Sequence, residues 1–197
     1  MSAESDADDV PVYACQLRLG RPGVRLRLAP PLLEWTIGPQ QGETALADIT
    51  RVRLTWRPGQ LMKAAFHLEL AARDGLRLEI GSVSRVSIAG VRDQGPAYAA
   101  FVRALHRALT ASGARPEYQA GFAPWRWRLM VGLLVAAVAA ALVMGWQVAA
   151  AAPVHVTLFV AFMLVAVAVP AVTSVIRNRP ERYPAGLPPE RLLPQPD

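Results

Sequence analysis

Arginines are the side chains in this sequence whose type and spacing most clearly suggest chemistry. Four of them, Arg18, Arg21, Arg25 and Arg27, fall in the short stretch RLGRPGVRLRL. An arginine near an anionic membrane surface contributes about 1 kcal/mol of attraction, so this cluster can contact anionic lipid head groups. A solvated basic face is the alternative interpretation, and these residues alone leave both open.

A second arginine cluster, Arg51, Arg53 and Arg57, alternates with apolar residues in ITRVRLTWRP. Glu69 and Glu79 fall on the outward faces of neighbouring predicted strands, where opposite charges form cross-strand pairs. We therefore expect an ion ladder here. Positive charge alone also suits nucleic acid, but no aromatic residues interleave with the arginines, so we predict no nucleic-acid binding.

Residue types that catalyse reactions are few and scattered along the chain. There is one cysteine, Cys15, and there are three histidines, His67, His106 and His155. The periods of their segments predict that Cys15 is a small buried side chain and that His67 and His106 face solvent. The motifs GxxxxGK[ST], HExxH and GxSxG do not occur. We expect no catalytic residue, no metal site and no cofactor, and therefore no enzyme.

The elements that would position these side chains are strands over most of residues 10–94. Four segments alternate apolar and polar residues with the period of a half-buried strand, namely 24–28, 49–58, 65–71 and 76–80. Weaker patterns predict strands over 12–19 and 32–37. The RPG and DG sequences that separate these segments are typical of tight turns. We expect six or seven antiparallel strands in a meander or small barrel.

The hydrophobic period changes to that of a helix over residues 96–113, PAYAAFVRALHRALTASG. Pro96 fits the first turn of a helix and Gly113 fits the position just after its end. The predicted fold is therefore mixed, with an antiparallel β-structure capped by one amphipathic helix. One apolar stripe contains Tyr98, Phe101, Val102, Leu105 and Leu109.

Two uncharged runs follow, over residues 129–152 and 154–176. As a helix, the first run is about 36 Å long, which exceeds the roughly 30 Å hydrocarbon core of a bilayer. Pro153 lies between the runs, at a position where a helix can begin. We predict a transmembrane hairpin, with the membrane as a partner of the chain.

The charges around this hairpin predict its orientation. Arginines precede the first run and follow the second, whereas the connecting turn has no Lys or Arg. The positive-inside rule therefore places both termini in the cytoplasm. The predicted interfacial anchors are Trp125, Arg126, Trp127, Arg128, Arg177 and Arg179.

Small residues recur every four positions in the first run, at Ala137, Ala141 and Gly145. This spacing lets another helix approach closely, so we predict helix packing through these three residues. The second span and another subunit are both possible partners. The abundance of alanine in this run makes a chance pattern an open alternative.

The segment after the hairpin is rich in proline and also apolar. Its prolines disfavour a helix and lack the donors of a sheet, so we expect an extended, partly polyproline II tail. Such an apolar segment needs a surface that buries it. We predict that the tail docks on the preceding domain, with a partner protein as the alternative and a loose terminus as the third possibility. The docking residues would be Tyr183, Leu187, Leu192 and Leu193.

The strands with RPG and DG turns, followed by AYAAFVRALHRAL, resemble a pleckstrin-homology-like (PH-like) domain. The chain is similar to small bacterial inner-membrane proteins with a PH-like head, a two-helix hairpin and a tail of the type NRPxxYxPxxLPxxLLP. Here the tail reads NRPERYPAGLPPERLLP, one residue shorter after Tyr183. The resemblance implies a membrane location, no catalytic residues, and lipid contact through the first hairpin.

The predicted organisation comprises an acidic disordered segment (1–9), a PH-like domain (10–118), a linker (119–128), transmembrane helices (129–152 and 153–176) and a proline-rich cytoplasmic tail (177–197). Residues 10–118 contain fifteen Lys and Arg against eight Asp and Glu, a net charge of +7. We predict a non-enzymatic membrane adaptor or assembly factor at the cytoplasmic face of a bacterial inner membrane. The alternative is an accessory subunit of a larger envelope or transport complex.

Overall fold

The computed structural model describes residues 10–194 except 19, 21, 59–64, 86, 88, 89 and 152. The predicted acidic segment 1–9 and Arg21 therefore lie outside the described residues. The chain forms two compact units. We call Met1–Ala120 with Glu181–Asp197 the β-rich unit, and Gly121–Pro180 the helical hairpin.

The first sheet of the β-rich unit is an antiparallel meander in the order β1-β2-β3-β4. Its strands are β1 (Val12–Cys15), β2 (Val24–Ala29), β3 (Leu32–Ile37) and β4 (Gln40–Ala45). Leu26 and Leu28 of β2 are buried, whereas Arg25 and Arg27, which alternate with them, are exposed. The period-2 alternation in the sequence thus corresponds to a core face and a solvent face.

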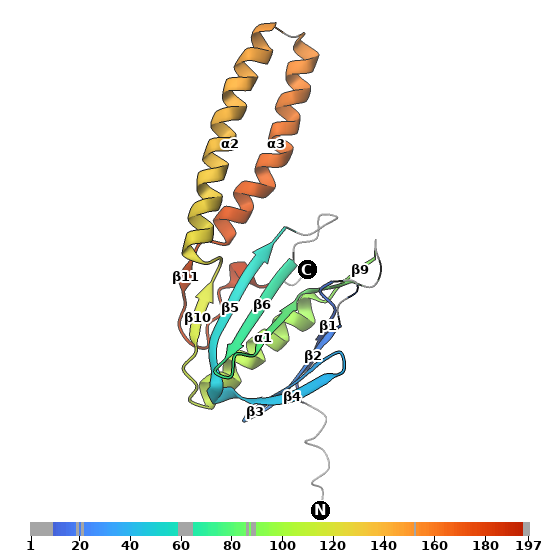
Figure 1. Cartoon of the computed structure of the whole chain (residues 1–197), viewed down its shortest axis with the longest axis vertical. Helices are drawn as coiled ribbons and strands as arrows, with labels where there is room; N and C mark the ends of the chain where they lie inside the picture. Colours follow the sequence, from blue (N-terminus) through green and yellow to red (C-terminus); the bar gives the residue numbers. More distant parts are fainter. Residues whose placement is uncertain are drawn as a thin grey trace, which may run out of the picture. The chain divides into compact units, whose positions relative to one another are not determined.

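The second sheet has the order β11-β10-β5-β6-β7, as Figure 1 shows for β11, β10, β5 and β6. The strands β5, β6 and β7 are antiparallel to one another, and β10 is parallel to β5. A separate short hairpin pairs β8 with β9. The bounds are β5 Ile49–Arg57, β6 Ala65–Ala72, β7 Arg77–Gly81, β8 Val83–Arg85, β9 Val91–Asp93, β10 Glu117–Ala120 and β11 Glu181–Arg182.

The mixed fold agrees with the prediction, although the described strands form three separate sheets with no barrel closure shown among them. Helix α1 (Gly95–Ala111) buries its predicted apolar stripe in the core. Cys15 is also buried, as predicted, and burial raises the pKa of its thiol. One hydrophobic core therefore joins both larger sheets and α1.

The helical hairpin consists of α2 (Pro124–Ala151) and α3 (Val154–Arg177), which run side by side in Figure 1. Both helices are long and apolar enough to cross a membrane, and almost none of their apolar side chains are buried by the protein. An exposed apolar surface of this length suggests membrane association, because it has no favourable partner in water.

The open end of the hairpin is fixed by hydrogen bonds between its first and last residues. The Phe122 N–H donates to the Asn178 carbonyl at 3.1 Å, and the Trp127 indole N–H donates to the Val175 carbonyl at 2.9 Å. The Asn178 side-chain amide donates to the Ser174 carbonyl at 2.9 Å, which satisfies a carbonyl at the end of α3. The first two bonds hold the two chain ends of the hairpin together.

Gly121 makes this closure possible, and its replacement tests it. Its φ is +75°, and a Cβ there would lie 2.3 Å from the Asn178 carbonyl oxygen. We expect Gly121→Ala to destabilise the hairpin by about 2–5 kcal/mol, from backbone strain plus steric overlap. Gly132→Ala is the matched control, because a Cβ at Gly132 meets no atom within 4 Å. Thermal unfolding in mild detergent, followed by far-ultraviolet circular dichroism, compares them; equal melting temperatures would contradict the closure.

Candidate functional site: the docked C-terminal segment

The segment after α3 joins the second sheet through β11. Glu181 and Arg182 pair antiparallel with β10, and the Tyr183 N–H donates to the Tyr118 carbonyl at 3.3 Å. Ion pairs support the strand, since Arg182 contacts Glu117 at 2.7 Å. The prediction that this tail forms no sheet was therefore wrong, because residues 181–183 contain no proline and can pair where the flanking residues cannot.

Beyond β11, a hydrogen bond buried in the core ties the segment to α1. The His106 side chain is fully buried, and its Nδ1 lies 2.7 Å from the Val102 carbonyl oxygen. A carbonyl only accepts, so Nδ1 carries the proton and Nε2 is the acceptor. The Tyr183 hydroxyl, 3.0 Å from Nε2, therefore donates to it. This is the arrangement of a neutral His106.

The surroundings of this bond favour the neutral form of both groups. The rings of Tyr118 and Tyr183 lie within 6 Å of the His106 ring, which closes the site to water. Burial lowers the pKa of His106, and the hydrogen bond to Val102 opposes that effect only in part. Burial also raises the pKa of Tyr183, and Tyr118 adds to the increase.

The predicted exposure of His106 was therefore wrong. The helical period places His106 opposite the apolar stripe of α1, but the C-terminal segment covers that second face. No pattern within α1 could reveal this, because the covering residue is 77 positions away in the sequence. His67 faces solvent less than predicted, since only 12% of its side chain is exposed and its Nδ1 lies 3.1 Å from Glu79.

The final described residues of the segment belong to the core. Leu192 and Leu193 are buried, at the end of a 3-10 turn over Glu190–Leu192. Pro194 lies against Gly95 at the start of α1, where a Cβ would be 3.1 Å from the proline ring. Arg191 forms an ion pair with Glu181 at 2.6 Å and so closes the segment on itself. The segment is thus packed against α1 and the second sheet near both of its ends.

Leu187 is the exception among the predicted docking residues, since 69% of its surface is exposed. Its N–H donates to the Pro184 carbonyl at 3.4 Å, which makes a turn. This turn directs Gly186, with φ +78°, towards the Thr110 hydroxyl of α1. The backbone of Gly186 therefore approaches α1 and the Leu187 side chain does not, so the prediction for Leu187 was wrong.

The arginines of the first hairpin differ in their surroundings. Arg27 donates two hydrogen bonds to the carboxylate of Glu34 on β3, at 3.0 and 3.1 Å. Arg25 is exposed on the same face of β2, opposite Thr36 in register. Arg18 is also exposed and lies close enough to Glu79 to contribute to the lowering of its pKa, after the larger effect of His67. The charge of Arg27 is therefore compensated within the protein.

The expected ion ladder on the second sheet is seen in part among the described residues. Arg57 contacts Glu79 at 3.3 Å across the sheet. Arg53, in contrast, donates from Nε to the Gln119 side-chain oxygen at 2.9 Å. The Arg51 Nε is buried and has no hydrogen-bond acceptor among the described residues.

The predicted interfacial anchors lie at the chain ends of the helical hairpin. Trp125 is largely exposed, whereas Trp127 is half-buried by its bond to α3. The Arg126 guanidinium lies 5.6 Å from the centre of the Phe122 ring, a cation–π distance. The three remaining anchors, Arg128, Arg177 and Arg179, are exposed.

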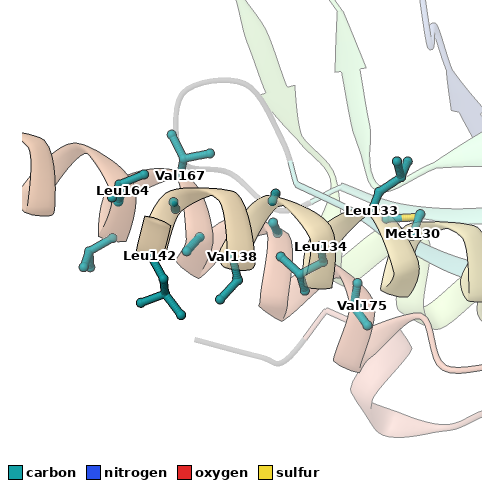
Figure 2. Close-up of a pocket in the computed structure, with 13 residues that line it drawn as sticks. Met130, Leu133, Leu134, Val138, Leu142, Leu164, Val167 and Val175 are labelled. Atoms are coloured by element: carbon teal, nitrogen blue, oxygen red, sulfur yellow. The ribbon is translucent and has the colours of Figure 1, made fainter. Parts of the chain in front are cut away.

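An apolar groove of about 540 Å³ runs along the helical hairpin. Figure 2 shows lining side chains from both helices, among them Leu134 and Val138 of α2 and Val175 of α3. Ala137 and Ala141 also line it, so their small side chains help to create the hollow. Gly145 does not line the groove, and a Cβ there would meet no atom within 4 Å.

Comparison of the chain with protein families, curated proteins and solved structures finds no match. The functional conclusions therefore depend on the chain's own residues.

Proposed function

We propose that this chain is a non-enzymatic membrane adaptor or assembly factor whose β-rich unit is a PH-like domain. The domain would lie at the cytoplasmic face of a bacterial inner membrane, with both chain ends in the cytoplasm. Exposed apolar surface along α2 and α3 supports the membrane anchor. The arginine-free connection between these helices supports the orientation.

The observation that carries this proposal is the return of the chain to the β-rich unit after the hairpin. Ala120 ends β10 and Glu181 begins β11, and these two residues are partners in one sheet. The chain thus enters and leaves its apolar hairpin from paired strands, and residues 183–194 complete the core of the domain. Two covalent connections restrict a domain more than one linker does, which suits a protein that presents a surface at the membrane.

Lipid contact through the first hairpin can be tested by comparing two arginine variants, one of which serves as the control. Arg25→Gln should weaken the binding of phosphatidylglycerol about fivefold, the effect of about 1 kcal/mol per arginine. Arg27→Gln should have a smaller effect, because Glu34 already compensates its charge. Native mass spectrometry of the full chain in mixed micelles measures the bound lipid. Equal binding by the wild type and Arg25→Gln would contradict lipid contact at this hairpin.

The groove between α2 and α3 favours a second candidate function, an accessory subunit whose hairpin packs against the helices of a larger complex. Small side chains such as Ala137 and Ala141 permit close helix packing. Extraction of the native membrane with a disc-forming polymer distinguishes the two functions. A stoichiometric membrane-protein partner would support the accessory subunit, whereas discs containing this chain and lipid alone would support the adaptor.

A further inference from the structure

A polar hollow of about 340 Å³ lies on the solvent face of the second sheet, apart from the first hairpin. Residues of β5, β6, β7 and β10 and of the β6–β7 connection line it, and Glu117 on β10 contacts Arg182 of the docked segment. The strand register explains why this place is hollow. Arg51 of β5 is paired with Ala71 of β6, which in turn is paired with Arg77 of β7. A small alanine thus separates two arginines in one cross-strand row. The lining residues are Thr50, Arg51, Ala71, Ala72, Gly75, Leu76, Arg77 and Glu117.

Arg51 lies opposite Glu117 of β10 in register, and the neighbouring row of the sheet differs from this one on β6 and β7. There Arg53 is paired in register with Glu69, and Glu69 with Glu79. The positive charge in that row faces carboxylates on the next two strands. In the row of the hollow, the corresponding positions are Ala71 and Arg77, so β6 and β7 contribute no acid.

The Arg51 side chain also has an unsatisfied donor. Its Nε is buried and has no hydrogen-bond acceptor among the described residues. Buried guanidinium N–H groups are normally hydrogen-bonded, because desolvation without a partner is costly. The other polar side chain on β5 at this place, the Thr50 hydroxyl, already donates to the Ala71 carbonyl at 3.0 Å.

Glu117 is the one acidic residue that lines the hollow, and it is held by other groups. Its pKa is lowered first by a hydrogen bond from the Gln119 side chain, and also by Arg182 and Arg51. Arg182 contacts its carboxylate at 2.7 Å. With Arg182 counted, three arginines face one carboxylate around the hollow, which leaves a local charge of +2.

We propose that Arg51 and Arg77 bind a doubly charged oxyanion, a phosphate monoester or inorganic phosphate, over Ala71. Arginine binds phosphate oxygens through paired, charge-assisted hydrogen bonds. A dianion balances both guanidinium groups, whereas a single carboxylate balances only one. The phosphate can come from a lipid head group or from solution, and both sources present the same chemistry to the site.

Thermal unfolding of the full chain in uncharged detergent tests the site. Inorganic phosphate should raise the melting temperature with saturation, at constant ionic strength. Arg51→Gln and Arg77→Gln should each raise the half-saturating concentration about tenfold or more, since each removes a charge-assisted hydrogen bond. Arg103→Gln, an exposed change on α1, is the matched control and should respond like the wild type.

Ala71→Glu tests the site while both arginines are kept. A glutamate between Arg51 and Arg77 would supply a carboxylate internally, at the position that Glu69 occupies opposite Arg53 in the neighbouring row. This variant should lose the response to phosphate while keeping the near-ultraviolet circular dichroism of the wild type, which checks that it is folded. Phosphate also stabilises proteins generally by exclusion from their surface, so an equal response in all variants would overturn the proposal.

Short-chain phosphatidic acid, compared with inorganic phosphate, identifies the source of the anion. If the increase in melting temperature half-saturates at a lower concentration of the lipid than of phosphate, and Arg51→Gln abolishes it, the natural ligand is a lipid head group. A response to inorganic phosphate without one to the lipid would assign a free anion. The absence of any Arg51-dependent response to either would refute the site.

Discussion

Removal of residues 181–197 is expected to destabilise the β-rich unit strongly. The deletion takes away an edge strand and three side chains that the core buries, Tyr183, Leu192 and Leu193. Truncation of one fully buried leucine to alanine typically costs about 2–5 kcal/mol. Because domains are usually stable by only about 5–15 kcal/mol, loss of the whole segment should leave the unit marginal or unfolded.

Two single substitutions measure how much side-chain packing contributes to the free energy of unfolding, without deleting any residues. Leu192→Ala should lower the free energy of unfolding by about 2–5 kcal/mol, because this side chain is 0% exposed. Leu187→Ala, five positions earlier in the same segment, should change it by less than about 0.5 kcal/mol, because that side chain is 69% exposed. Urea unfolding of the full chain in mild detergent, followed by near-ultraviolet circular dichroism, measures both.

This comparison also separates docking on the chain's own domain from recognition by another protein. If the melting temperature of the β-rich unit stayed the same after deletion while a partner was lost, the segment would serve that partner. Equal effects of Leu192→Ala and Leu187→Ala would contradict the packing described above. If the deletion destabilised the unit only because the chain is shorter, Leu192→Ala and Leu187→Ala would not differ in stability.

Sequence periodicity correctly predicts the strands that have one buried face and one solvent-exposed face. β2, β5, β6 and β7 alternate apolar and charged residues, and each lies close to its predicted bounds. β4, with the sequence QQGETA, has no such alternation because only Thr44 is buried. Its existence depends on pairing with β3, which is a property of the sheet and not of the segment.

The candidate site was partly predictable, because apolar side chains indicate that a segment is buried but do not indicate its partners. The apolar content of the C-terminal segment indicated that something buries it, and the structure places three of the four predicted docking residues in the core. The details were hidden because they depend on distant partners. His106 looks solvent-facing on α1 until Tyr183 covers it, and Leu187 looks apolar enough to dock until a turn directs it outward.

The stability of the β-rich unit should decrease as the pH falls below about 6.5, and His106 should cause this decrease. The folded state holds His106 neutral because burial lowers its pKa, whereas the unfolded chain protonates near pH 6.5. Between the ordinary value and the lowered one, the unfolded state therefore binds more protons. Linkage then removes up to about 1.4 kcal/mol of stability per pH unit in that interval. Above pH 7 the contribution of His106 should not change.

Urea unfolding of the full chain between pH 5 and 8 measures this slope for the wild type and two variants. His106→Gln should flatten the decrease, because the titrating group is gone. Tyr183→Phe should be less stable but keep the slope, because burial is the first cause of the lowered pKa and the tyrosine hydroxyl is not. Glu79 and Glu117, whose pKa values are lowered, should contribute only at lower pH than His106. If the free energy of unfolding depended on pH equally in His106→Gln and the wild type, another group would cause the decrease. The assignment of a buried, neutral His106 would then be refuted.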